Sequence, residues 1–359
     1  AGPLIGGGHA MRCLTLADAL AERGAEATFV TSAMPETLAQ RISRSGHRLV
    51  RIPALPEMRR EGDDWHKLPL SAEAIAADVE ATGAAIGKAE WLIVDHYLLN
   101  ARWHSAARTF ADRILVIDDL ANRAYDCDLL LDQTHGRAAA DYRPFVSEQA
   151  KVLTGATYAL LRPEFGRERP DALLRRREPG PVQRMLVSLG TTDPDGITAK
   201  IVDRLLAAAP GCALDVVLAP GAGSLDRVRE VANRESNVTL HVGTDRMAEL
   251  MRDADLAIGA AGTTSWERCC LGLPSILITL ADNQRRAAEA LARAGAAVDL
   301  GWHDGVTVER LSGALAALAR SPSRLASMSR SAAAVTDGRG TQRVEREIMR
   351  LSEGGPAGG

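Results

Sequence analysis

The residues best suited to catalysis lie at the start of the chain, in the run I-G-G-G-H-A-M-R-C at residues 5–13. Glycines let the backbone turn tightly and approach a ligand closely, and the free N–H groups of a helix start attract anions. His9 is therefore placed to act as a general base, because a helix N-terminus disfavours the imidazolium form. Gly7, Gly8 and Arg12 are predicted to contact substrate beside it. The alternative is a strand-to-helix turn in which the histidine only caps the helix.

A second set of polar residues follows the apolar strand predicted at residues 91–95, W-L-I-V-D. The carboxyl end of such a strand is where α/β folds keep their active groups. Tyr97 offers a phenol that can bind a sugar or a water molecule, and Asp95 could orient an imidazole or a hydroxyl of the substrate. The alternative for Asp95 is that it caps the next turn, as aspartates at strand ends often do.

Two Gly-rich turns in the second half of the chain suit a phosphate. The first, S-L-G-T-T-D at residues 188–193, presents Gly190 and Thr191, whose N–H and hydroxyl groups can bind phosphate oxygens. The second, G-A-A-G-T-T-S-W-E at residues 259–267, runs from a strand into a helix and gives the stronger signal.

The second turn combines a helix start with a carboxylate. Gly262, Thr263 and Thr264 would bind phosphate at the helix N-terminus, and Glu267 would accept hydrogen bonds from the two ribose hydroxyls. The alternative is a capping box, in which Thr264 and the residue three positions on satisfy the helix N–H groups.

A third polar group in this half consists of Asn283 and Gln284, which follow an apolar strand at residues 275–280. Their neutral amides suit sugar hydroxyls or N-acetyl groups, whereas a helix cap by Asp282 is the alternative. The remaining histidines show no spacing such as H-E-x-x-H, so we predict that the protein binds no metal.

Alternating short apolar strands and amphipathic helices position these groups, and they occur in two blocks. Residues 163–181 separate the blocks, because four prolines in nineteen residues, together with several arginines, suit a solvated linker. We therefore predict two doubly wound α/β domains with the ligand cleft between their strand edges. The expected divisions are a domain with the Gly-rich loop at 1–165, a linker at 166–181, a domain with the predicted phosphate and ribose contacts at 182–336, a helix that packs back on the first domain at 337–352, and a disordered tail at 353–359.

Composition excludes several classes of protein. The 359 residues carry a net charge of −3 with charges spread throughout, so nucleic acid is not an expected partner. No apolar run approaches the length of a membrane span, and five cysteines without a C-x-x-C pair suit a reducing compartment. We expect a cytoplasmic monomer. The first four residues are too short and Pro-broken for the strand that normally precedes such a glycine loop, so the natural N-terminal strand is expected to be missing.

Taken together, these motifs resemble the UDP-2,4-diacetamido-2,4,6-trideoxy-β-L-altropyranose hydrolases of pseudaminic acid biosynthesis, which serve flagellin glycosylation and are relatives of the MurG-type glycosyltransferases. The resemblance extends over nearly the whole chain. It rests, in order, on I-G-G-G-H-A-M-R-C, I-V-D-H-Y, I-D-D-L-A-N-R, C-D-L-L-L-D-Q, Y-A-L-L-R-P-E-F, V-S-L-G-T-T-D, G-A-A-G-T-T-S-W-E and A-D-N-Q.

The resemblance implies a GT-B-like fold of two Rossmann-like domains and a hydrolysis that needs neither metal nor cofactor. Water would attack the anomeric carbon of the UDP-sugar, release UDP and invert the configuration. In this sequence His9 matches the family's general base, Tyr97 its active-site tyrosine, Asn283 a polar group near the sugar and Glu267 the ribose contact. The first strand is the one departure.

Two other functions stay open. A MurG-like glycosyltransferase would use the same UDP site but pass the sugar to an acceptor, and the absence of a basic amphipathic membrane helix in the first domain favours hydrolysis. A non-catalytic module that only binds nucleotide-sugars is the third possibility. The presence of both His9 and Tyr97 argues against it.

Overall fold

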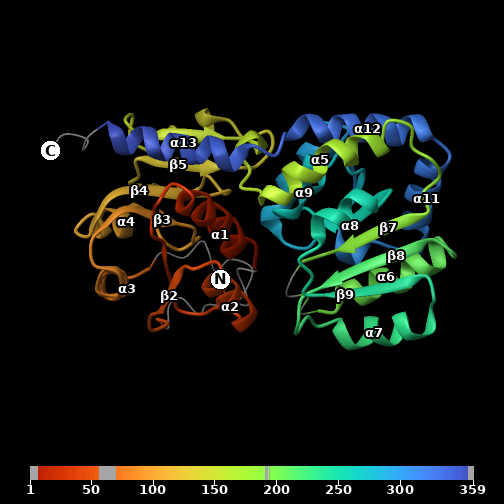
Figure 1. The fold of residues 1–359 in the computed structure, drawn as a ribbon, viewed down its shortest axis with the longest axis horizontal. Helices are drawn as coiled ribbons and strands as arrows, with labels where there is room; N and C mark the ends of the chain where they lie inside the picture. Colours follow the sequence, from red (N-terminus) through yellow and green to blue (C-terminus); the bar gives the residue numbers. More distant parts are fainter. Residues whose placement is uncertain (1–6, 56–69, 191–192, 194, 355–359) are drawn as a thin grey trace. The chain divides into compact units, whose positions relative to one another are not determined.

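The computed structural model describes residues 7–55, 70–190, 193 and 195–354. The chain forms two compact units (Figure 1). The N-terminal unit comprises residues 1–160 and 341–359, and the C-terminal unit comprises residues 161–340. Residues 1–6, on which the expectation of a missing first strand rests, lie outside the described residues.

The N-terminal unit is built on a four-stranded parallel sheet of order β3-β4-β5-β6. Its strands are β3 (Ala89–Val94), β4 (Ala111–Ile117), β5 (Leu129–Asp132) and β6 (Lys151–Thr154). A separate two-stranded parallel sheet pairs β1 (Thr28–Thr31) with β2 (Arg48–Arg51). The helices are α1 (Gly7–Ala21), α2 (Glu36–Arg44), α3 (Ala72–Ile86), α4 (Ala101–Ala107) and α13 (Gly340–Glu353), with short 3₁₀ turns η3 (Ala139–Asp141) and η4 (Ala156–Tyr158).

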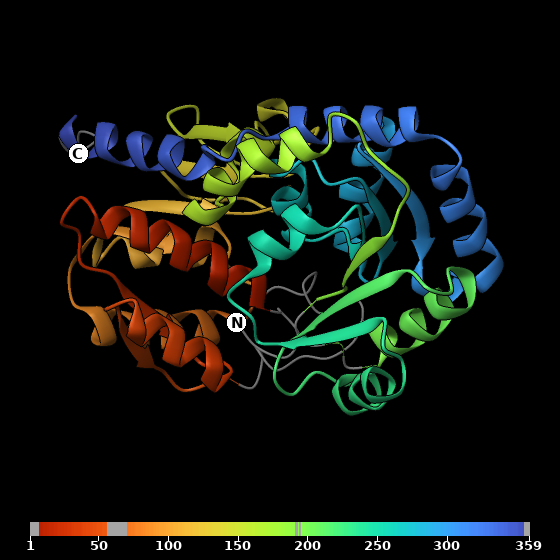
Figure 2. The same ribbon diagram turned by 45° about the vertical axis from the view of Figure 1, so that its right-hand side comes forward.

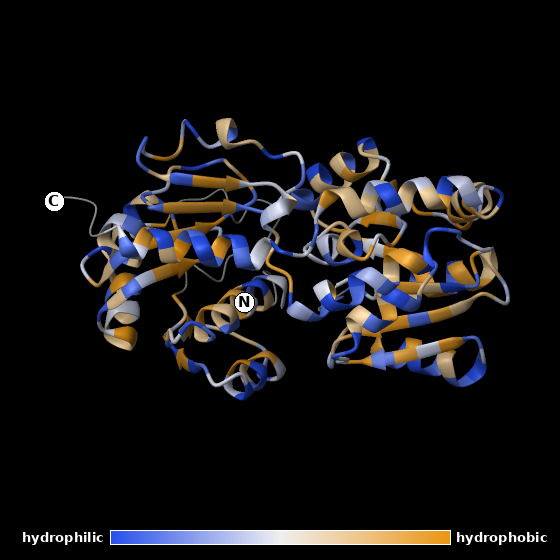
Figure 3. Ribbon diagram, turned by 45° about the horizontal axis from the view of Figure 1, so that its top comes forward, coloured by the Kyte–Doolittle hydropathy of each residue, from blue (hydrophilic) through white to orange (hydrophobic). Residues whose placement is uncertain are grey.

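The alternation of side chains along β4 explains why helices cover both faces of this sheet. Leu115 faces a cluster that contains Leu16 of α1 and Val344 of α13, all of them buried. The preceding residue, Ile114, faces the opposite cluster with Trp103 of α4. Successive side chains of a strand point to opposite faces, so a strand that is apolar at every position must be covered on both. Figure 3 shows the predominantly hydrophobic strands.

The C-terminal unit has a six-stranded parallel sheet of order β12-β11-β10-β7-β8-β9. The first strand of this unit, β7, lies in the middle of the sheet. The chain continues outward through β8 to β9 and then returns to β10 on the other side of β7. The carboxyl ends of β7 and β10 therefore flank the point where the strand order reverses, which is where open α/β sheets bind ligands.

The bounds of its elements follow the alternation expected from the sequence. The strands are β7 (Arg184–Ser188), β8 (Ala213–Leu218), β9 (Val238–Val242), β10 (Leu256–Ala260), β11 (Ser275–Thr279) and β12 (Ala297–Trp302). The helices are α5 (Pro163–Arg175), α6 (Ile197–Ala208), α7 (Leu225–Arg234), α8 (Met247–Asp253), α9 (Thr264–Cys270), α10 (Arg285–Arg293), α11 (Val308–Ala319) and α12 (Pro322–Val335), with 3₁₀ turns η5 (Asp282–Gln284) and η6 (His303–Gly305).

The predicted linker at residues 166–181 is wrong for most of its length, because α5 occupies residues up to Arg175. Proline is tolerated at the first helical position, and Pro163 stands there. Arg167, Arg175 and Arg177 are exposed as expected, but two other arginines of this stretch bind the ends of other helices. Arg169 is half-buried and donates to the carbonyls of Ala333 (2.8 Å) and Thr336 (2.9 Å) at the end of α12. Arg176, which is 5% exposed, donates to the carbonyls of Met251, Arg252 and Ala254 at the end of α8. These arginines satisfy carbonyls that a helix end leaves unpaired.

The chain's last helix, α13, belongs to the N-terminal unit although it follows the C-terminal unit in sequence (Figure 2). Ile348 is buried against the sheet, and the indole N–H of Trp91 on β3 donates to the hydroxyl of Ser352 at 2.9 Å. Of the tail predicted to be disordered, Glu353 ends this helix, and residues 355–359 lie outside the described part of the chain. Within the described ranges, no helix combines the length and apolarity needed to cross a membrane.

Candidate active site

A buried charge cluster joins the start of α1 to the end of β3. The Nδ1 atom of His9 lies 2.5 Å from Oδ1 of Asp95, the residue that directly follows the strand. Arg12, one turn further along α1, grips the same carboxylate with two hydrogen bonds of 2.6 Å. The side chains of Arg12 and Asp95 are each 4% exposed, and that of His9 is 13% exposed.

The charge state of this cluster decides what His9 can do. Burial by itself would raise the pKa of Asp95, but Arg12 and His9 hold it well below its ordinary value. An ionised carboxylate only accepts, so Nδ1 of His9 must donate to it. In the neutral imidazole this hydrogen bond fixes the tautomer, so that Nε2 carries the lone pair that a general base requires.

Neither bland alternative for these two residues describes the structure. His9 directs its ring nitrogen to a side chain on another element rather than to the backbone of α1. Asp95 accepts hydrogen bonds from His9, Arg12 and the thiol of Cys13 (3.5 Å). Arg12 donates two hydrogen bonds to the same carboxylate, so in this structure it holds the cluster together.

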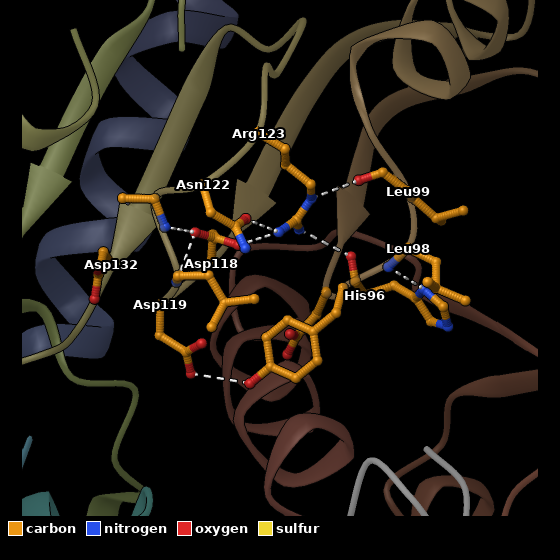
Figure 4. Close-up of polar contacts among 12 residues, drawn as sticks. His96, Leu98, Leu99, Asp118, Asp119, Asn122, Arg123 and Asp132 are labelled. Carbon is orange, nitrogen blue, oxygen red and sulfur yellow. Dashed lines mark hydrogen bonds and ion pairs between the residues drawn. The ribbon is translucent and has the colours of Figure 1, made fainter. Parts of the chain in front are cut away.

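Tyr97 lies next to this cluster. Its ring packs edge-on against that of His9, with centroids 5.0 Å apart, and Tyr97 is 8% exposed. Its hydroxyl donates to Oδ2 of Asp119 at 3.1 Å, a contact drawn in Figure 4. Burial raises the pKa of Asp119 to about 6, assisted by the neighbouring carboxylate of Asp118 and opposed by the positive charge of Arg12.

The loop that carries Tyr97 is braced from the neighbouring strand end. Arg123 pairs with Asp118 at 2.9 Å and donates to the carbonyls of Leu99 and His96, both at 3.2 Å (Figure 4). Asp118 also accepts the backbone N–H of Ala121 at 2.8 Å. Sequence reasoning missed this bracing and missed Asp119, although the acidic pair after an apolar strand was a usable signal.

His96, between Asp95 and Tyr97 in sequence, is a poor candidate for the base. Burial lowers its pKa to about 4, and its Nδ1 accepts the backbone N–H of Leu98 at 3.2 Å. The imidazole is therefore neutral at pH 7, with its remaining proton on Nε2.

In the C-terminal unit, the turn between β10 and α9 holds the predicted phosphate and ribose contacts. Gly262, Thr263 and Thr264 lead into α9, and Glu267 lies in its first turn, 3.6 Å from the guanidinium of Arg162. Burial raises the pKa of Glu267, while Arg162 opposes that shift. The capping-box alternative is wrong, because Thr264 is the first residue of α9 and not its N-cap. The N-cap residue is Thr263, and its side chain makes no capping hydrogen bond.

The end of β10, where this turn begins, packs against the buried guanidinium of Arg268. A Cβ atom at Gly259 would lie 2.2 Å from the guanidinium of Arg268 and 3.1 Å from the carbonyl oxygen of Ser188, so only glycine fits there. Arg268 is 2% exposed and donates to the carbonyl of Ala260 at 2.7 Å and to the hydroxyl of Ser265 at 2.9 Å. The turn is thereby held from below. At Gly262, by contrast, a Cβ would meet nothing within 4 Å.

The remaining predicted residues are placed more loosely. Gly190 follows β7, the strand beside β10, and Thr191 lies outside the described residues. The carboxamide oxygen of Gln284 accepts the backbone N–H of Leu280 at 3.0 Å, and Asn283 is exposed in η5. Asp282 does not cap α10, whose N-cap residue is Gln284 without a side-chain bond.

The structure thus brings the predicted residues together in two sets, one in each unit. His9, Arg12, Asp95 and Tyr97 form the first, with Gly7 and Gly8 in the same turn of α1 as the histidine. The second comprises the turn from Gly262 to Glu267, with Gly190 at the adjacent strand end. Over the residues that the structure describes, no group of three or more His, Cys, Asp and Glu side chains is arranged to hold a metal ion.

Residues 192–344 match the C-terminal domain of glycosyltransferase family 28. The chain is 28% identical over 218 residues to the spore coat polysaccharide biosynthesis protein SpsG of Bacillus subtilis, covering 59% of this chain and 62% of that protein. It is 24% identical over 213 residues to the UDP-2,4-diacetamido-2,4,6-trideoxy-β-L-altropyranose hydrolase of Campylobacter jejuni, covering 59% of this chain and 74% of the hydrolase. An uncharacterised protein of Methanocaldococcus jannaschii, MJ1062, is 23% identical over 288 residues, and the chain spans 54% of its length.

Solved structures with similar folds cover nearly the whole chain. MurG of Acinetobacter baumannii superimposes with a TM-score of 0.64 at 17% identity, covering 98% of this chain and 97% of MurG. MnaA of Staphylococcus aureus, solved with UDP, gives a TM-score of 0.65 at 13% identity, covering 97% and 95%. The chain therefore has the GT-B fold, and its sequence is similar to that of the Campylobacter jejuni hydrolase.

Proposed function

We propose that the protein is a metal-independent hydrolase that releases UDP from UDP-2,4-diacetamido-2,4,6-trideoxy-β-L-altropyranose, as in pseudaminic acid biosynthesis. The observation that carries the proposal is the contact of 2.5 Å between Nδ1 of His9 and Asp95, which leaves Nε2 of His9 as a proton acceptor. The similarity to the Campylobacter jejuni hydrolase supports this substrate.

In the proposed reaction, the oxygen of a water molecule attacks the anomeric carbon on the face opposite UDP. The bond from that carbon to the phosphate oxygen breaks, and its electron pair leaves with UDP, while the proton of the water passes to Nε2 of His9. Asp95 stabilises the imidazolium that forms. Because UDP is a good leaving group, no strong general acid is required, and the single displacement inverts the configuration.

UDP would bind to the C-terminal unit in this proposal. The N–H groups of residues 262–264 would receive a phosphate, and Glu267 would accept hydrogen bonds from the ribose. Their position beside the reversal of strand order, between β7 and β10, supports this assignment. Tyr97 and Asn283 would contact the sugar, together with Gln284.

A glycosyltransferase is the second candidate, and the match of residues 192–344 to a glycosyltransferase domain favours it. It would differ only in the nucleophile, which would be an acceptor hydroxyl instead of water. A module that binds the nucleotide-sugar without reacting is the third, and the buried His9–Asp95 pair speaks against it, since binding alone needs no oriented base.

The test is to incubate the protein with this UDP-sugar and with UDP-N-acetylglucosamine in the presence of EDTA, and to follow UDP and free sugar. Hydrolysis predicts equal amounts of both products without an acceptor, and NMR before mutarotation should show the inverted anomer first. Release of UDP only after an acceptor is added would identify a transferase. Binding without product would leave only the non-catalytic module.

A further inference from the structure

The structure contains a second carboxylate beside Tyr97 whose role the reaction above does not use. Asp119 lies two residues after the end of β4, and Tyr97 lies three residues after the end of β3. The two strands are parallel neighbours, with Val94 of β3 opposite Val116 of β4. The two side chains therefore reach the same edge of the sheet, where the hydroxyl of Tyr97 donates to Oδ2 of Asp119 at 3.1 Å.

Asp119 differs from Asp118, the acid before it in sequence. Asp118 stabilises the fold. Its carboxylate accepts hydrogen bonds from the backbone N–H groups of Leu120 (2.9 Å) and Ala121 (2.8 Å) and from the hydroxyl of Tyr142 (2.9 Å). It also forms an ion pair with Arg123. Asp119 holds no loop through its carboxylate. Figure 4 shows the carboxylate of Asp119 pointing away from Arg123, and its Oδ2 accepts the hydroxyl of Tyr97 instead.

The other oxygen of Asp119, Oδ1, is the more informative atom. It is buried, and no described residue gives it a hydrogen bond. Buried polar atoms without a partner are rare in folded proteins, and each calls for an explanation such as a catalytic or ligand-binding role. A carboxylate oxygen only accepts, so the missing partner must be a donor.

Resting on the proposed function, we propose that Asp119 is a substrate-binding residue with a separate task for each oxygen. Its Oδ2 fixes the phenol of Tyr97, and its Oδ1 accepts a hydrogen bond from a hydroxyl or amide N–H of the bound sugar. The affinity for UDP alone should therefore not depend on Asp119.

The charge on Asp119 makes this contact sensitive to pH. The ionisable groups around it are Arg12 and His9 on α1, Asp118 and Asp132 at the ends of β4 and β5, and Tyr97 after β3. Burial raises the pKa of Asp119 to about 6. The accepting carboxylate is therefore present above pH 6 and is lost as the pH falls through that value.

The test separates binding from turnover by using the His9→Asn variant as a background that keeps the sugar attached. Calorimetry would measure UDP and UDP-2,4-diacetamido-2,4,6-trideoxy-β-L-altropyranose against this protein with and without Asp119→Asn. Loss of one such contact should weaken the UDP-sugar about 10- to 100-fold, as for a hydrogen bond to a charged group, and should leave the Kd of UDP unchanged. Asp112→Asn is the matched control, because Asp112 is an exposed acid on the same strand.

The dependence on pH gives a readout that a structural role would not move. Affinity for the UDP-sugar should fall below pH 6 in the background protein and stay flat in the Asp119→Asn variant. Equal affinities in the Asp119 and Asp112 variants would overturn the inference, as would failure of this UDP-sugar to bind at all. A protein that binds the sugar through Asp119 but never releases UDP would refute the hydrolase alone.

Discussion

The two candidate sets of residues are built in opposite ways. In the N-terminal unit, reactive side chains hold one another: Asp95 is shared by His9 and Arg12 at 2.5 to 2.6 Å and is almost fully buried. In the C-terminal unit, the turn before α9 offers mainly backbone and a single carboxylate, Glu267, with one long ion pair of 3.6 Å. In the proposed function, the first set carries out the reaction and the second binds UDP. Substitutions in the two should therefore separate kcat from affinity.

The largest effect is expected at His9. Proton removal by a positioned side chain contributes about 10²- to 10⁴-fold in rate, so His9→Asn should lower kcat by that factor. The Kd of UDP should stay unchanged, because the predicted UDP contacts belong to the other unit. Steady-state kinetics and calorimetry on the same protein sample provide the two numbers.

The chain offers a close control for this substitution. His47 is 7% exposed and its Nε2 lies 2.8 Å from Asp18, whose side chain is half-exposed. The two form a second His–Asp pair in the same unit. His47→Asn should reduce thermal stability but not kcat. If both variants lost activity alike, the effect of His9 would be structural rather than catalytic.

A smaller loss of rate is expected at Asp95. Asp95→Asn keeps the size of the side chain but removes the charge that fixes the tautomer of His9. We expect kcat to fall about 10²-fold, the lower end of what a positioned base contributes. It also leaves Arg12 buried without its carboxylate, which should cost about 3 to 5 kcal/mol in free energy of unfolding. Denaturant melts and kinetics are measured in parallel, with Asp18→Asn as the control. An active and equally stable variant would contradict the role assigned to the pair.

At Glu267 the expected effect shifts from rate to affinity. Glu267→Gln should weaken UDP binding by about 1 to 3 kcal/mol, because a charged hydrogen-bond acceptor for the ribose is lost. The control is Glu164→Gln, since Glu164 contacts the same Arg162 at 2.9 Å but lies outside the turn. Calorimetric titration with UDP should distinguish the two variants. Unchanged affinity after the Glu267 substitution would rule out the ribose contact.

The sequence predicted the fold more completely than the site. Apolar strands such as β3 and β4 are recognisable because burial on both faces requires continuous hydrophobic runs. The helix α5 was missed because the arginines of this stretch suggested a solvated linker, whereas the structure uses Arg169 and Arg176 on carbonyls at the ends of other helices. Such contacts depend on which helix ends meet in space, and no local pattern records that.

For the candidate site, a short motif pointed to His9 and a strand end pointed to Asp95 and Tyr97, and the structure brings these three side chains together. His9 and Asp95 are 86 positions apart in the chain. The sequence therefore suggested several possible partners for Asp95 and did not single out His9. Asp119 was missed because its importance comes from the neighbouring strand that brings Tyr97 to it. Residue types can be read from the chain, but the partners of each side chain follow from the packing of the sheet.

The smallest effect on UDP binding should come from Gly262 in the turn before α9, and a comparison with Gly259 at the end of β10 would show whether this turn binds through its backbone. A Cβ at Gly262 would meet no protein atom within 4 Å, so Gly262→Ala should leave stability unchanged or raise it by about 0.4 to 1 kcal/mol. If phosphate approaches this backbone, the added methyl group should still weaken UDP binding by about 1 kcal/mol. Gly259→Ala should instead destabilise the protein, because its Cβ would collide with Arg268. We expect the free energy of unfolding to fall by about 1 to 3 kcal/mol. Thermal melts and UDP titrations of both variants make the comparison, and full UDP affinity in the Gly262 variant would place the phosphate elsewhere.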